Sequence, residues 1–214
     1  MRICSLTLLA ALAAIVAVAG CTSTSEGSPR AVPGHTADDS GASTPPPTET
    51  ADLPYAGAPA VKSPMDSERF QQDPCQALTA DQADVLNVET PGKLRDGGLG
   101  NACEFRGLSD RRALVEIASL DKNPYGVSAL YQAEQDGKLA FLTPLEPIEG
   151  YPAVAYGAPD ERETGGCSVV IGASDEIAFE IVLQLSTDKV GKKEPCETAA
   201  MVAGMVVETM KAAQ

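Results

Sequence analysis

The cysteine at position 21 has the clearest chemical context in this sequence. It ends the run Val18-Ala19-Gly20-Cys21, which follows an apolar stretch from Leu6 to Ala19 with Arg2 ahead of it. A short apolar region, two small residues and a cysteine are typical of a bacterial lipoprotein signal peptide. The pattern predicts that a diacylglycerol, with acyl chains such as palmitate, is attached to the Cys21 thiol and that residues 1–20 are removed. The apolar stretch is shorter than the roughly 20 residues that span a bilayer, so we expect the lipid to hold the chain at the extracytoplasmic face of the cell membrane.

Four further cysteines lie in the C-terminal part of the chain: Cys75, Cys103, Cys167 and Cys196. An exported compartment permits disulfides, and an even number of cysteines favours two bridges. We expect the pairs Cys75–Cys103 and Cys167–Cys196, because each joins the start of a helix to a strand that is near in sequence. A zinc site is the alternative, but no Cys-x-x-Cys spacing occurs, and the one histidine, His35, precedes all four cysteines.

The single histidine also limits catalysis. Ser-His-Asp and Cys-His mechanisms both need an imidazole base. The chain contains neither a Gly-x-Ser-x-Gly elbow nor a phosphate-binding Gly-x-x-x-x-Gly-Lys-Ser/Thr loop. Paired carboxylates could still hydrolyse glycosides, although acidic residues are so frequent that no pair stands out. We therefore predict no catalytic residue, no metal and no cofactor, and keep a carboxylate-dependent glycosidase as the alternative.

The charge of the chain excludes one class of partner. It has 16 basic and 30 acidic residues, for a net charge of -14. Nucleic-acid binding depends on neutralising phosphates with Lys and Arg, so we expect no nucleic-acid partner. A charge of this kind keeps an exported surface soluble.

Composition divides the mature chain into two parts. Residues 21–69 are rich in Ser, Thr, Pro, Gly and Ala and lack apolar periodicity, which predicts a disordered tether. Residues 70–214 have the length and the apolar content of a single domain.

Apolar periodicity and capping signals predict the elements of this domain. We expect a helix capped by Thr79 and Gln82 and ending near Leu86, a helix from Asn123-Pro124 to about Gln135, and a helix beginning at Pro195. The expected strands are Ala102–Arg106, Ala113–Leu120, Leu139–Leu142, Ala153–Tyr156, Cys167–Ile171 and Ile177–Leu185, the last two forming a hairpin. Together they predict an α+β fold, an antiparallel sheet with helices packed on it, two disulfides and a disordered tether in front.

The last helix has an apolar stripe of mostly small residues: Cys196, Ala199, Val202, Ala203, Val206 and Met210. Such a stripe can open an apolar cavity for a lipid between helix and sheet. The alternative is close packing of the helix on the sheet.

Five segments resemble a known family when taken in order: Asp73-Pro74-Cys75-Gln76-Ala77-Leu78-Thr79, Cys103-Glu104-Phe105, Gly150-Tyr151-Pro152-Ala153-Val154, Gly166-Cys167-Ser168-Val169 and Pro195-Cys196-Glu197-Thr198-Ala199. They are similar to actinobacterial lipoproteins of the domain of unknown function 3558 type. Members of that family usually have Trp where this chain has Phe105, and the resemblance implies no catalytic residue. The function expected is therefore that of a lipid-anchored envelope lipoprotein with a non-catalytic domain that binds a protein, a wall component or a small or lipidic ligand.

Overall fold

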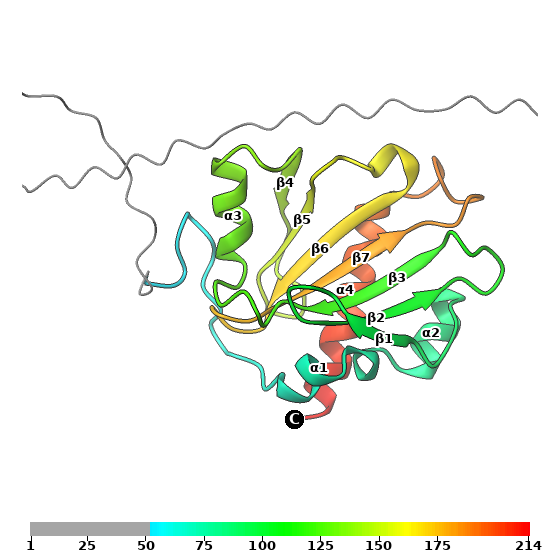
Figure 1. The fold of residues 1–214 in the computed structure, drawn as a ribbon, viewed down its shortest axis with the longest axis horizontal. Coiled ribbons are helices and arrows are strands. Elements are labelled where there is room, and N and C mark those ends of the chain that lie inside the picture. The colour runs from blue at the N-terminus through cyan, green and yellow to red at the C-terminus, as the bar shows by residue number, and fades with distance from the viewer. Residues whose placement is uncertain (1–51) are drawn as a thin grey trace, which may run out of the picture. The chain divides into compact units, whose positions relative to one another are not determined.

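One antiparallel sheet organises the computed structural model, which describes residues 52–214 (Figure 1). Its seven strands are arranged in the order β1-β2-β3-β7-β6-β5-β4. The strands are β1 Lys93–Asp96, β2 Asn101–Arg106, β3 Leu114–Ser119, β4 Phe141–Pro144, β5 Ala153–Gly157, β6 Gly166–Gly172 and β7 Ala178–Gln184. The predicted α+β class and the antiparallel pairing are both confirmed.

The predicted hairpin of β6 and β7 forms the centre of this sheet. Val169 pairs with Ile181 and Cys167 with Leu183, so these four side chains share one face. β3 then joins the far side of β7, with Ile117 opposite Ile181. Alternation along the two hairpin strands predicts their pairing from the local sequence. The β3–β7 pairing, in contrast, joins residues that are at least 60 positions apart in sequence.

The final helix α4, Pro195–Ala212, covers one face of the sheet. Its predicted stripe is buried: Ala199, Val202, Ala203, Val206 and Met210 have no exposed surface. They pack with Phe179 and Ile181 of β7 in the main core. The small side chains therefore bring the helix close to the sheet, which favours close packing over a lipid cavity at this position.

Helix α3, Ser128–Gln135, covers part of the opposite face. Val127, Leu130 and Tyr131 pack there in a second core that includes Val154 and Val170. The predicted start at Asn123-Pro124 is wrong, because the helix begins four residues after Pro124. Gly126 interrupts it with a φ of 48°, and a Cβ at this glycine would lie 2.3 Å from the Asp175 carbonyl oxygen. The segment is thus a turn that docks on the β6–β7 connection.

Helix α2, Ala80–Leu86, has the predicted capping box. The Gln82 backbone N–H donates to Thr79 Oγ1 at 3.2 Å, and Gln82 Oε1 accepts from the Thr79 N–H at 2.8 Å. Asn87 ends the helix in the left-handed conformation. The remaining helical segments are short: α1 Glu68–Gln72, and the 3₁₀ turns η1 Pro74–Ala77 and η2 Arg162–Thr164.

Two strands depart from the sequence-based prediction. β1 was not predicted, since all four of its residues are exposed and show no alternation. β4 begins two residues after the predicted Leu139. Both lie at the edges of the sheet, where a strand pairs on one side only and burial imposes little pattern.

Both predicted disulfides form. Cys75 at the start of η1 is bonded to Cys103 in β2, and Cys167 in β6 is bonded to Cys196 at the start of α4. The Cα–Cα distances are 5.0 and 5.1 Å, within the usual range for a disulfide. Each bridge therefore ties a helical segment to the sheet face that it covers.

Described residues that precede the predicted domain boundary at residue 70 contact the domain. Residues 52–67, here called the N-terminal strap, pack against the domain, and Met65 is only 6% exposed. Backbone N–H groups hold the strap: Tyr55 donates to Ser128 Oγ, Val61 to Asp175 Oδ1, and Met65 to the Ala173 carbonyl. Bonds of this kind need no apolar periodicity, so the sequence pattern did not reveal them. The rest of the predicted tether, the predicted signal peptide and Cys21 lie outside the described residues.

Candidate functional site

A groove of about 560 Å³ opens at one end of the sheet. It is lined by residues of segments 85–88, 107–115, 183–189 and 193–201. One wall is α2 with the turn between β2 and β3, and the other is the loop after β7 with the start of α4, on the right-hand side of Figure 1. Its volume lies within the roughly 300–1,000 Å³ of typical small-molecule sites.

The floor of the groove is apolar. Val88, Val115, Leu183 and Leu185 line it and are otherwise buried in the core. The walls add two exposed apolar side chains, Val85 at 73% and Met201 at 47% exposure. Exposed apolar side chains that continue a buried apolar floor are typical of a surface that a ligand or partner covers.

Backbone bonds fix the first wall. The chain after α2 runs beside the end of β2, where the Glu89 N–H donates to the Arg106 carbonyl at 2.7 Å and the Leu108 N–H to the Asn87 carbonyl at 3.0 Å. The end of α2 is therefore held against the β2–β3 turn. This contact places Val85 at the mouth of the groove.

Asp110 joins the two walls. Its Oδ2 accepts from the Thr187 N–H at 2.6 Å, and its Oδ1 accepts from the Arg112 N–H at 2.9 Å. The hydrogen bond from Thr187, followed by that from Arg112, lowers the pKa of Asp110 to about 2. Asp110 is therefore ionised at any ordinary pH and keeps the β2–β3 turn attached to the loop after β7.

Basic and acidic side chains are balanced in the groove. Asp110 and Asp188 face Lys189 and Lys193 there, whereas the whole chain has 30 acidic and 16 basic residues. Lys189 Nζ pairs with Asp188 Oδ2 at 2.9 Å. Within residues 52–214, Lys193 has no carboxylate at ion-pair distance. Its ammonium is thus the one positive charge of the groove that no carboxylate neutralises.

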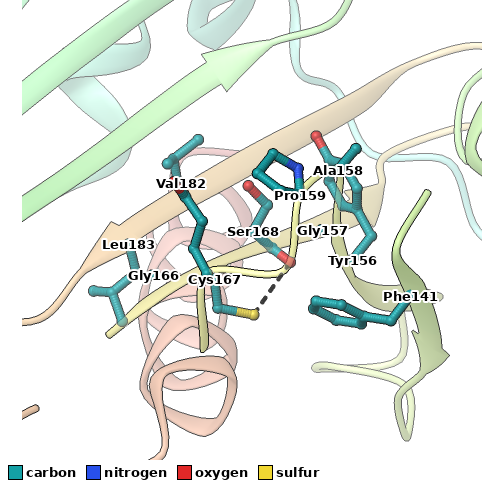
Figure 2. Close-up of a pocket in the computed structure, with 11 residues that line it drawn as sticks. Phe141, Tyr156, Gly157, Ala158, Pro159, Gly166, Cys167, Ser168, Val182 and Leu183 are labelled. Carbon is teal, nitrogen blue, oxygen red and sulfur yellow. Dashed lines mark hydrogen bonds between the residues drawn. The ribbon is translucent and has the colours of Figure 1, made fainter. Parts of the chain in front are cut away.

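A second hollow, of about 190 Å³, lies where β5 and β6 separate (Figure 2). Their last pair is Tyr156 with Ser168, after which Gly157 keeps its pair with Phe141 of β4 but has none in β6. Cys167 Sγ lies 3.6 Å from the Ser168 carbonyl oxygen, the dashed contact in Figure 2, but the disulfide leaves this sulfur no hydrogen to donate. The hollow is smaller than the roughly 300 Å³ at the lower end of ligand pockets, so it is the weaker candidate.

Beside this hollow, the Tyr156 hydroxyl donates to Glu180 Oε1 at 2.5 Å. Burial, followed by the charge of Glu180, raises the pKa of Tyr156. The tyrosine therefore stays protonated, and the pair holds β5 to β7 across β6.

Two carboxylates on the sheet face away from α4 are bound by arginines. Glu104 forms two 2.8 Å bonds with Arg106, and Glu116 pairs with Arg95. The hydrogen bond from Arg106 lowers the pKa of Glu104. A glycosidase needs a carboxyl group whose pKa is raised, so that it can donate a proton. The pKa of Glu104 is lowered instead, so this carboxyl group does not suit a proton donor.

Residues 52–214 hold no group of three or more His, Cys, Asp or Glu side chains placed to bind a metal ion. None of the helices in the same residues has both the length and the apolar character needed to cross a membrane.

Of the residues predicted from sequence, only Cys167 borders a hollow described above, and Cys21 lies outside the described residues. The groove residues were not predicted. Met201 offered a signal, because it is a large apolar residue outside the stripe of its own helix. The other walls come from segments that only the fold brings together.

The fold and the groove define a disulfide-bonded α+β domain with an open groove that has an apolar floor. A family model described as "Protein of unknown function (DUF3558)" matches residues 16–209, and the chain belongs to this family. Comparisons with curated proteins and with solved structures give no match.

Proposed function

We propose that this chain is a lipid-anchored lipoprotein of the actinobacterial cell envelope, and that its domain binds a ligand or partner without catalysing a reaction. The groove carries the binding part of the proposal, because it combines an apolar floor, exposed apolar walls and a few polar groups. A mostly apolar lining with a few polar groups is typical of sites that bind small molecules.

Two observations support an extracytoplasmic location. The run ending at Cys21 has the order of a lipoprotein signal. Two structural disulfides suit an oxidising compartment, since cytosolic thiols are kept reduced.

The absence of a nucleophile with a base supports a non-catalytic role. The domain sequence contains no histidine. In the groove, Asp110 is held by backbone N–H groups, and Asp188 by the Ser186 hydroxyl and by Lys189. These hydrogen bonds lower the pKa of both carboxylates, so each is a weak general base.

The anchor is tested by Cys21→Ala. In cells fed an alkyne fatty acid, we expect the wild-type chain to incorporate the label and Cys21→Ala to incorporate none, because the thiol is the acceptor. Cys4→Ala is the matched control, since it removes a cysteine that precedes the apolar stretch. Equal labelling of the wild type and Cys21→Ala would refute the lipid anchor.

The groove is tested by Met201→Glu, which places a charge on its wall. Leu99→Glu is the matched control, because Leu99 is 51% exposed and Met201 47%, and Leu99 does not line the groove. Mass spectrometry of small molecules that co-purify with each variant should show species that Met201→Glu loses and Leu99→Glu keeps. If both variants lose the co-purifying molecules, or if neither does, the groove is not the binding site.

A further inference from the structure

We propose that the groove binds an amphiphile with one anionic headgroup, its acyl chain on the apolar floor and its headgroup at Lys193. This inference rests on the proposed function and specifies its ligand class.

The acyl chain of the ligand is inferred from the apolar side chains that line the groove. Leu183 and Leu185 continue the buried core into the floor, and Val85 and Met201 extend it up opposite walls. Covering such side chains is favourable by roughly 25 cal/mol per Å² of apolar surface removed from water. A flexible alkyl chain can follow a floor of this kind because it needs no hydrogen bonds.

The anionic headgroup of the ligand is inferred from the charged side chains around Lys193. Asp110 accepts two backbone N–H bonds, Asp188 binds both Lys189 and the Ser186 hydroxyl, and neither carboxylate lies at ion-pair distance from Lys193. Lys193 also borders a neighbouring hollow with three carboxylates, Asp160, Glu163 and Glu194. Arg162 binds Asp160 at 2.5 Å, and none of the three lies at ion-pair distance from Lys193. An unpaired ammonium favours one carboxylate or phosphate group as its partner.

The net charge of the chain restricts the ligand further. With a net charge of -14, the protein repels anions at long range. A small anion gains only one exposed ion pair at Lys193, which contributes little. Binding therefore requires the apolar chain as well as the charge, and inorganic phosphate alone should not bind.

The strap leaves the groove open. It is bonded to Ala173 and Asp175, before the start of β7, whereas the groove is lined by the last two residues of β7 and the loop that follows. Figure 1 shows the strap and the groove loops at opposite ends of the sheet. An amphiphile can thus enter without displacing the strap.

The test uses residues 21–214 with Cys21→Ser, which retain every described residue. Calorimetric titration with dodecanoate and dodecyl phosphate, both below their micelle concentrations, should show binding. 1-Dodecanol should bind about three times more weakly, because it lacks one exposed ion pair, and inorganic phosphate should show no binding. Lys193→Ala should weaken the binding of both anions about threefold and leave that of dodecanol unchanged. Lys192→Ala removes a neighbouring exposed lysine that does not line the groove and should have no effect.

The two dodecyl anions distinguish a carboxylate from a phosphate headgroup, and tighter binding of either one agrees with the inference. Equal affinity for dodecanol and the anions, or equal losses in Lys192→Ala and Lys193→Ala, would overturn it. If no amphiphile binds while Met201→Glu still removes a co-purifying molecule, the ligand class is wrong and the groove remains the binding site.

Discussion

Replacing both Cys167 and Cys196 by alanine is expected to lower the free energy of unfolding by about 3.5 kcal/mol. The bridge joins residues 29 apart in sequence, and its loss restores that loop's freedom to the unfolded chain. It also releases the start of α4 from the sheet that this helix covers. Urea unfolding followed by circular dichroism measures the loss.

The second disulfide is a matched control for loop length, because Cys75 and Cys103 are 28 residues apart. Alanine at both positions should remove the same entropic contribution and an additional packing contribution. Cys103 has no exposed surface, and a Cβ placed on Gly92 would lie 2.4 Å from its sulfur, so the site is tightly filled. We expect this variant to lose more stability than the first.

Single substitutions check the pairing. Cys196→Ser should leave Cys167 as the only new free thiol, as detected by alkylation and peptide mapping. A new thiol at Cys75 or Cys103, or a stability loss below about 1 kcal/mol for either double variant, would contradict a structural role for these bridges.

Deleting residues 1–67 is expected to lower the free energy of unfolding by about 3 kcal/mol or more. Met65 belongs to the main core, and truncation of a buried methionine alone costs about 2–5 kcal/mol. The deletion also removes the strap's bonds to Ser128 and Asp175. Thermal and urea unfolding should show a cooperative transition at reduced temperature and reduced denaturant concentration.

A chain that begins at Asp52 is the control, because it keeps the whole strap. Met65→Ala in that chain separates the buried side chain from the backbone bonds and should account for most of the loss. If deletion to residue 67 leaves the midpoint unchanged, the strap contributes no stability, and the original boundary near residue 70 holds.

Several parts of this protein were determined by short-range sequence patterns. The alternation from Cys167 to Leu185 predicts the central hairpin, because successive strand side chains point to opposite faces. Thr79 and Gln82 predict the start of α2 because the capping box is local. The stripe of α4 and both disulfide pairs were likewise predicted from spacing, and each is confirmed.

Other parts were decided by tertiary structure. β3 pairs with β7, and no local pattern specifies which distant strand completes a sheet. The start of α3 was set by Gly126, which docks on Asp175. The strap was missed because it is held mainly by backbone hydrogen bonds rather than by an apolar stripe.

The groove also depends on tertiary structure rather than on local sequence patterns. Val85 and Lys193 carry no signal in the sequence, and Met201 differs only in being a large apolar residue outside the stripe of its helix. They line one groove because α2, the end of β7 and the start of α4 meet at the same end of the sheet. The sequence determined the class of fold and its covalent bridges because those depend on nearby residues. The binding surface required the tertiary structure because its chemistry comes from residues that only long-range packing brings together.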